Sequence, residues 1–259
     1  MTAIDAVSKK EMTMQTFERS AVLAGGASAA VQAPAAKHSG VDWERVWRQN
    51  GITLVLFFIA GYFVYGAPPQ IGAPADTLAS FYDGNRIRIA IAVFLFANAL
   101  LNLLWFATTI TSTLREAGQG GWGAAATAAS AVLGSVVVLL MTVGAGLAYS
   151  IGHSGNGALV SGLNDLVWIG VVMSAFPRAM LVMAGSFGFW RAGLISNAVF
   201  GAGVAAVVLV LLGGTTWTSS GIWAPDGAYS RLICPLINLA WFAAAGIIMT
   251  RTPATRAEW

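Results

Sequence analysis

Six apolar stretches, each close to or beyond the length that crosses a lipid bilayer, constrain this sequence more than any other feature. A transmembrane helix needs about 17–25 predominantly apolar residues. The six stretches are Gly51–Ala67, Ile87–Thr111, Ala124–Tyr149, Leu159–Ala184, Gly193–Gly213 and Ser230–Thr250. We therefore predict an all-α protein, a polytopic transmembrane helix bundle with six spans.

The composition excludes a soluble fold. Of the 259 residues, 57% are hydrophobic and 10% are charged, whereas soluble domains average about 45–50% apolar and about 25% charged residues. The single cysteine, Cys234, excludes an internal disulfide, and no Cys/His cluster is present for zinc or iron–sulfur. The net charge of +3 is too small to indicate nucleic-acid binding. We expect no metal, no cofactor and no nucleic-acid partner.

The positions of lysine and arginine predict the orientation, because these residues favour cytoplasmic loops. With a cytoplasmic N-terminus, eight of them flank the inner ends of the spans: Lys37, Arg45, Arg48, Arg115, Arg178, Arg191, Arg251 and Arg256. Three flank the outer ends: Arg86, Arg88 and Arg231. We therefore predict that both termini are cytoplasmic.

The polar ends of the chain differ in character from the spans. Residues 1–40 have mixed charge and then an Ala/Gly/Ser run, which predicts a disordered cytoplasmic tail and linker. Residues 41–50 are predicted to form an interfacial juxtamembrane helix. The transmembrane domain takes residues 51–250, and residues 251–259 form a short cytoplasmic tail. The connections, including the proline-rich one at 66–83, are too short for a second domain.

Five residues are candidates for anchors at the membrane interface, where tryptophan and long basic side chains gather. Trp43 and Trp47 lie four residues apart on one face of the juxtamembrane helix. Trp190 and Arg191 lie in a short connection between spans. Arg178 follows a proline that should kink the fourth span, and we expect its side chain to reach the headgroups.

The second span carries a polar stripe. Asn98, Asn102, Trp105 and Thr109 follow at steps of four, three and four residues, which places them on one helical face. Polar groups are costly in hydrocarbon, so this face should avoid lipid. Two interpretations remain open: the stripe forms interhelical hydrogen bonds, or it faces a ligand.

Related segments recur in the even-numbered spans. Asn102–Ala107 reads NLLWFA, Asn238–Ala243 reads NLAWFA, and Asp165–Trp168 reads DLVW. They indicate either a hairpin repeated three times or a coincidence in a chain rich in Leu, Ala and Trp. Because an unpaired amide or indole is costly in hydrocarbon, we expect Asn102, Trp105, Asn238 and Trp241 to point into the bundle. The second and sixth spans should then share a polar contact.

Asp165 is the only acidic residue inside a span. Arg86, Arg88 and Arg231 are its candidate partners on the same side of the membrane. A structural ion pair, a carboxylate that couples protons or cations, and a carboxylate that simply reaches water are the three alternatives.

No catalytic motif is convincing. The segment Gly152–Gly155 has the G-x-S-G form seen around the nucleophile of rhomboid-type intramembrane proteases. A serine nucleophile also needs a histidine base within reach. His153 is its sequence neighbour, and His38 lies in the tail on the opposite side. We predict no catalytic residues.

The spacing of several motifs resembles a known group. Phe81–Arg88 precedes an apolar helix that closes with Leu104–Ala107, then Leu114–Gly118 follows, and Phe189–Arg191 forms a later turn. Over about residues 50–250 this resembles an abundant group of uncharacterised bacterial six-helix integral membrane proteins that carry a domain-of-unknown-function label. The resemblance implies a bacterial origin and this topology, and no activity.

These observations favour a non-enzymatic, multi-pass protein of the bacterial cytoplasmic (inner) membrane. It would bind a lipid or another apolar molecule, or act as an accessory subunit of a membrane complex. Membrane lipids are the expected partners, with partner subunits or a homo-oligomer as further alternatives. A small permease with a path lined by the Asn stripe and Asp165 is the second hypothesis, and an unrecognised membrane enzyme is the third.

Overall fold

The computed structural model describes residues 47–251, and within this range the chain forms helices and no β-strand. The helices in chain order are α3 (Asn50–Tyr65), α4 (Ala75–Gly84), α5 (Arg86–Glu116), α6 (Gly120–Tyr149), α7 (Gly157–Met173), α8 (Ala175–Arg191), α9 (Asn197–Gly213) and α10 (Cys234–Arg251). A 3₁₀ turn, Ile151–His153, precedes α7, and a π-helical turn, Tyr229–Ile233, leads into α10. The predicted tails and the first part of the juxtamembrane helix, including Trp43, lie outside the described residues.

Within residues 47–251, four helical segments are long and apolar enough to cross a membrane: α5, α6, the α7–α8 segment Gly157–Arg191, and Tyr229–Arg251. They confirm an all-helical fold with helices of membrane-spanning length. The other two predicted spans are the apolar helices α3 and α9, of 16 and 17 residues. At about 1.5 Å per residue these helices are shorter than a hydrocarbon core of about 30 Å. That α3 and α9 also cross the membrane stays a prediction.

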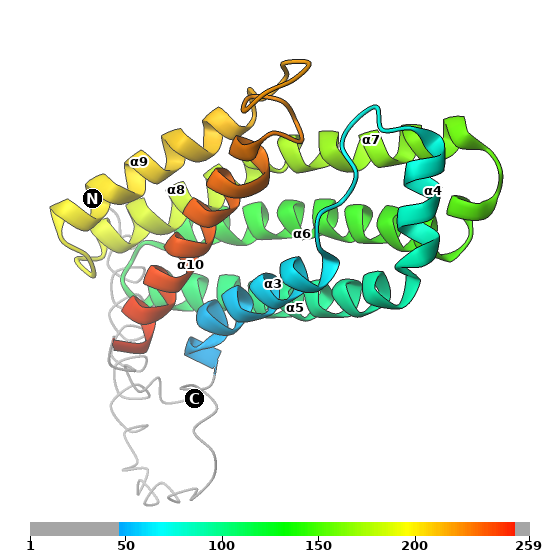
Figure 1. Ribbon diagram of the computed structural model, residues 1–259. Coiled ribbons are helices and arrows are strands. Elements are labelled where there is room, and N and C mark those ends of the chain that lie inside the picture. Colours follow the sequence, from blue (N-terminus) through cyan, green and yellow to red (C-terminus); the bar gives the residue numbers. More distant parts are fainter. Residues whose placement is uncertain (1–46, 252–259) are drawn as a thin grey trace, which may run out of the picture. The chain divides into compact units, whose positions relative to one another are not determined.

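Helix α4 differs from the sequence-based prediction of a loop between the first two spans. Pro74 precedes its first residue, a position where the fixed backbone angle of proline favours helix initiation. Leu78 and Tyr82, one helical turn apart, are both fully buried against α6 and α7. The spacing of these two residues was the available signal, and the surrounding prolines obscured it. Figure 1 shows α4 lying across one end of α5, α6 and α7.

The helix contacts close a ring. Helix α3 packs against α5, α5 against α6, α6 against α8, α8 against α9, α9 against α10, and α10 returns to α3. Helix α7 directly precedes α8 in the chain, and it contacts α4 and α6 (Figure 1). The side chains that point into this ring therefore form the interior of the protein.

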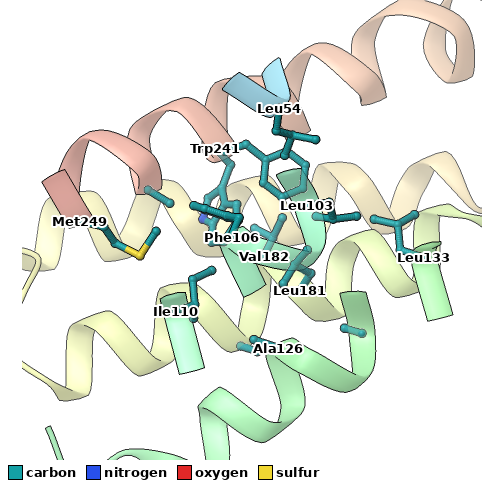
Figure 2. Close-up of a cluster of buried hydrophobic side chains, with 14 of the residues drawn as sticks. Leu54, Leu103, Phe106, Ile110, Ala126, Leu133, Leu181, Val182, Trp241 and Met249 are labelled. Carbon is teal, nitrogen blue, oxygen red and sulfur yellow. The ribbon is translucent and has the colours of Figure 1, made fainter. Parts of the chain in front are cut away.

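Three apolar clusters fill the interior of the described bundle. The smallest surrounds Tyr229 and Cys234, where α8, α9 and the start of α10 meet, and the other two form most of the interior. The larger of these two joins α3, α5, α6, α8 and α10, and Figure 2 shows Phe106 and Trp241 near its centre. Their rings meet edge to face with centroids 6.4 Å apart, a favourable geometry for aromatic pairs. The smaller cluster surrounds Leu78 and Tyr82 of α4, at the other end of α5 and α6.

Candidate functional site

A cavity of about 270 Å³ lies where the two main clusters meet. Leu103 and Leu133 of the larger cluster and Tyr82 of the smaller one all line it. Its volume is near the lower limit of ligand pockets, which range over about 300–1,000 Å³. The walls are mainly apolar and aromatic, which suits a hydrocarbon chain or a compact ring system.

The cavity separates α7 from α10. Val167 and Val171 of α7 line one wall, and Pro235 and Leu239 of α10 line another. These two helices do not pack extensively against each other, although each packs against other members of the bundle. A molecule in the cavity would therefore fill the space between α7 and α10.

Arg178 is the most unusual residue in the lining, because its charge lies within a span. The α7–α8 segment is interrupted at Ser174, three residues before Pro177. A proline at this position has no N–H for the carbonyl four residues earlier, so it opens the helix. The Arg178 side chain turns back to the freed end of α7. It donates from Nε to the Ser174 carbonyl at 3.1 Å and from Nη2 to the Val171 carbonyl at 2.7 Å.

The remaining contacts of Arg178 are also with uncharged groups. Nη2 donates to the Ser174 hydroxyl, and Nη1 lies 3.7 Å from the sulfur of Cys234. The cation thus rests on the negative end of the α7 dipole. The structure places this side chain against the cavity, which corrects the expectation that it reaches the headgroups. The physical reason is that the helix break supplies carbonyl acceptors inside the bundle.

Arg231 supplies a second cation to the lining. It lies in the π-helical turn before α10, directly upstream of Pro235, which has no N–H for the Arg231 carbonyl. Single π turns of this kind are frequent at functional sites. The Nε of Arg231 is buried without a hydrogen-bond partner.

Asn238 adds an unpaired acceptor to the same wall. The residue is 3% exposed, and its Nδ2 donates to the carbonyl of Cys234 at 3.1 Å. Its Oδ1 is buried without a partner. Arg231, Pro235, Asn238 and Phe242 follow at steps of four, three and four residues, so one face of this segment carries the lining.

The charge of the lining is unbalanced. Two arginines contribute to it, and no described residue of the lining is acidic. Buried charges are usually paired, because removing an ion from water is expensive. The cavity is therefore a cationic site in an apolar environment, and it favours an anion.

A proline-rich strap, residues 66–74, crosses one side of the cavity. Gly66 and Pro68 line the cavity, and the Trp168 indole donates to the carbonyl of Pro69 at 2.9 Å. Burial raises the pKa of Tyr82, so its hydroxyl keeps its proton and donates to Asn164 at 2.9 Å. The first bond fixes the strap to α7, and the second joins α4 to α7.

Asp165 also contacts this strap, so it does not form the structural ion pair, which was the first of its three alternatives. Its Oδ1 accepts from the backbone N–H of Gly72 at 3.4 Å, and Asp226 accepts from the neighbouring N–H of Ile71 at 3.1 Å. Within residues 47–251, Asp165 forms no ion pair with the three predicted arginines. Backbone donors of the strap are nearer than any of those cations.

Two of those arginines contact aromatic rings instead. The Arg86 guanidinium lies 4.5 Å from the centre of the Tyr149 ring, and that of Arg88 lies 5.7 Å from the centre of the Phe81 ring. Such cation–π contacts are worth about 0.5–1 kcal/mol at exposed sites. The third, Arg231, lines the cavity.

The Asn stripe of α5 does not line the cavity. The Asn98 and Asn102 amides each donate at 2.8 Å to the carbonyl four residues earlier, and Thr109 donates to the Trp105 carbonyl at 3.0 Å. The helix therefore satisfies these donors by itself, as serine and threonine often do. Trp105 is 51% exposed, which contradicts its predicted place inside the bundle.

On α10 the prediction holds. Asn238 and Trp241 are both buried, and the Trp241 indole donates to the Ser186 hydroxyl of α8 at 2.9 Å. The expected polar contact between α5 and α10 is wrong, because neither Asn102 nor Trp105 bonds to α10. Phe106 makes the contact between the two helices through its ring.

The remaining interface candidates lie at the surface. Trp47 is 44% exposed and stacks on Trp105 with ring centroids 5.3 Å apart. Trp190 is partly exposed, donates to Asn197 at 2.8 Å and stacks on Phe200, and Arg191 is exposed. Their position at a membrane interface stays a prediction.

The sequence held a signal for Arg178 that a count of cations overlooks. A serine and a proline precede it within a span, and together they mark a break that leaves carbonyls free. The roles of Arg231 and Asn238 depend on which faces of α7 and α10 meet, which local patterns do not specify.

The chain matches no family model, no curated protein and no solved structure. The likeness to uncharacterised bacterial membrane proteins therefore stays a prediction.

Proposed function

We propose that this chain is a non-enzymatic membrane protein that binds a lipid or another apolar molecule in the cavity between α7 and α10. The observation that carries the proposal is a largely apolar cavity of about 270 Å³ between two packed clusters. Well-packed interiors contain few voids larger than a water molecule, so a space of this size in a packed bundle favours a bound molecule.

The setting we propose is the bacterial cytoplasmic membrane, with six spans and both termini inside. The eight-to-three distribution of cations supports this orientation. In a Cys234→Ser background, cysteines introduced at Ser154 and Ser219, both exposed in loops, should react with an impermeant thiol reagent in intact cells. Labelling of Arg191→Cys with silence at the other two sites would refute the orientation.

Filling the cavity tests the binding function. Leu239→Trp adds volume to a lining residue, and Leu236→Trp makes the same change at a residue that is 60% exposed and outside the lining. Native mass spectrometry of protein purified in mild detergent should detect a bound small molecule in the parent and the Leu236 variant. The Leu239→Trp protein should have lost it. Equal occupancy in all three proteins, or none in the parent, would contradict the proposal.

A further inference from the structure

We infer that the ligand of this cavity is a single-chain amphiphile with one anionic group, which Arg178 and Arg231 bind. The inference rests on the proposed function and adds the chemistry of the ligand. It follows from an apolar cavity that carries two cations and no described acidic residue. The shared chemistry is a carboxylate or a phosphate at the end of one hydrocarbon chain.

Three polar residues of the lining lie close together at the start of α10. Cys234 links them: its sulfur lies 3.7 Å from Nη1 of Arg178, and its carbonyl accepts from Asn238. Arg231 lies three residues before Cys234, on the face of the segment that lines the cavity. Arg178, Arg231 and Asn238 thus surround the start of α10. Phe96, Leu133 and Val137 line other parts of the cavity and would contact the chain.

The hydrogen bonds of these residues leave capacity for an anion. Arg178 uses Nε and Nη2 on the end of α7, so that Nη1 has only the weak contact with sulfur. The Nε of Arg231 is buried and unpaired. Guanidinium groups bind carboxylates and phosphates through charge-assisted hydrogen bonds, which are about twice as strong as neutral ones. A bound anion would supply the missing partners.

The unpaired oxygen of Asn238 adds a second requirement. It is an acceptor, so it is complementary to a hydroxyl or a protonated oxygen beside the anionic group. A buried acceptor without a partner costs about 1–3 kcal/mol, and a ligand donor would remove that cost. The volume of the cavity favours one chain, because a two-chain lipid exceeds about 270 Å³.

Photo-crosslinking tests the inference with two probes of the same length. The probes are diazirine analogues of palmitic acid and of hexadecanol, presented to the full chain in nanodiscs of phosphatidylcholine. Both should label cavity residues by peptide mass spectrometry, and the acid should label them at least about tenfold more efficiently, as expected for one charge-assisted bond. Competition by a lysophosphatidate or by palmitate then distinguishes a phosphate from a carboxylate.

Arg231→Gln should abolish the preference for the acid while leaving hexadecanol labelling unchanged, and Arg231→Lys should restore part of it. Arg191→Gln, at an exposed position outside the lining, is the matched control and should keep the full preference. Arg178→Gln also removes hydrogen bonds to the end of α7. If that variant fails to fold, Arg231→Gln and Arg231→Lys still test the inference.

The outcomes separate the two proposals. Equal labelling by acid and alcohol in the parent would overturn the anionic ligand and leave a neutral apolar ligand. A preference that Arg231→Gln leaves unchanged would overturn the binding of the anion by Arg231. Displacement of both probes by a two-chain phosphatidate, but not by single-chain competitors, would overturn the single-chain assignment. Absence of labelling at the cavity by either probe would overturn the binding function itself.

Discussion

The segments Asn102–Ala107 of α5 and Asn238–Ala243 of α10 differ at one position of six, yet they lie in unlike surroundings. Trp105 is 51% exposed, whereas Trp241 is 9% exposed. The Trp241 indole has a buried hydroxyl partner on α8, and the Trp105 ring stacks on Trp47 at the surface. The tryptophan of the motif therefore lies in the interior on α10 and at the surface on α5.

The difference arises from rotation about the helix axis. Phe106 and Phe242 are both buried, and their rings meet edge to face with centroids 5.8 Å apart. Helix α10 also turns Trp241 inward, where Gly185 and Ser186 of α8 leave room for the indole. Small residues on a neighbouring helix thus decide which side of the motif is buried.

The largest expected effect is the contrast between the two tryptophans. Trp241→Ala should lower the free energy of unfolding by about 3–5 kcal/mol, the usual cost of truncating a large buried aromatic side chain. Trp105→Ala should cost less than about 1 kcal/mol, because most of that ring is already outside the interior. Unfolding in an SDS titration measures both. Similar losses at the two positions would show that Trp105 is as buried as Trp241 when the protein is in the membrane.

The close contact between Gly185 and the Trp241 ring gives the next largest effect. A Cβ added to Gly185 would lie 2.5 Å from the Trp241 ring, so Gly185→Ala should destabilise by about 1–3 kcal/mol through overpacking. Gly201→Ala on α9 meets nothing within 4 Å and is the control. It should be neutral or slightly stabilising, because alanine favours helix by about 1 kcal/mol. A neutral Gly185→Ala would mean that rotation of α10 does not depend on this contact.

The two asparagines should respond differently to replacement by leucine. Asn238→Leu removes an unpaired buried acceptor and keeps the branching and the number of side-chain heavy atoms, so it should raise the free energy of unfolding by about 1 kcal/mol. Ligand labelling in the cavity should fall at the same time. Asn102→Leu should change stability by less than about 0.5 kcal/mol, since its amide bonds only to its own helix. A destabilised Asn238→Leu variant would indicate a partner for Oδ1.

The long apolar helices and their order follow from the sequence, because hydropathy is a local property, whereas α4 was missed in the proline-rich connection. The cavity does not follow from the sequence, because it depends on helix rotation and on a gap between α7 and α10. Burial of polar residues was predictable only in part. Hydrocarbon penalises an unpaired amide, but the carbonyl four residues earlier satisfied Asn102 as well as another helix would. The polar face of α5 therefore does not need to meet another helix, although the polar face of α10 does face inward.

Asp165 begins the third, shorter version of the motif, and its effect should be the smallest. In α7 the motif again buries its tryptophan, and Trp168 donates to the strap that follows α3. Asp165 accepts a single long bond of 3.4 Å from the same strap at an exposed site. Asp165→Asn keeps an oxygen acceptor and should change the free energy of unfolding by less than about 0.5 kcal/mol, whereas Asp165→Leu should cost about 0.5–1.5 kcal/mol, the value of one ordinary hydrogen bond. SDS titration of both variants, with Asp76→Asn on the exposed side of α4 as control, measures the difference. A loss of several kcal/mol in Asp165→Asn would indicate that Asp165 does form an ion pair, because aspartate and asparagine have nearly the same shape and differ mainly in charge.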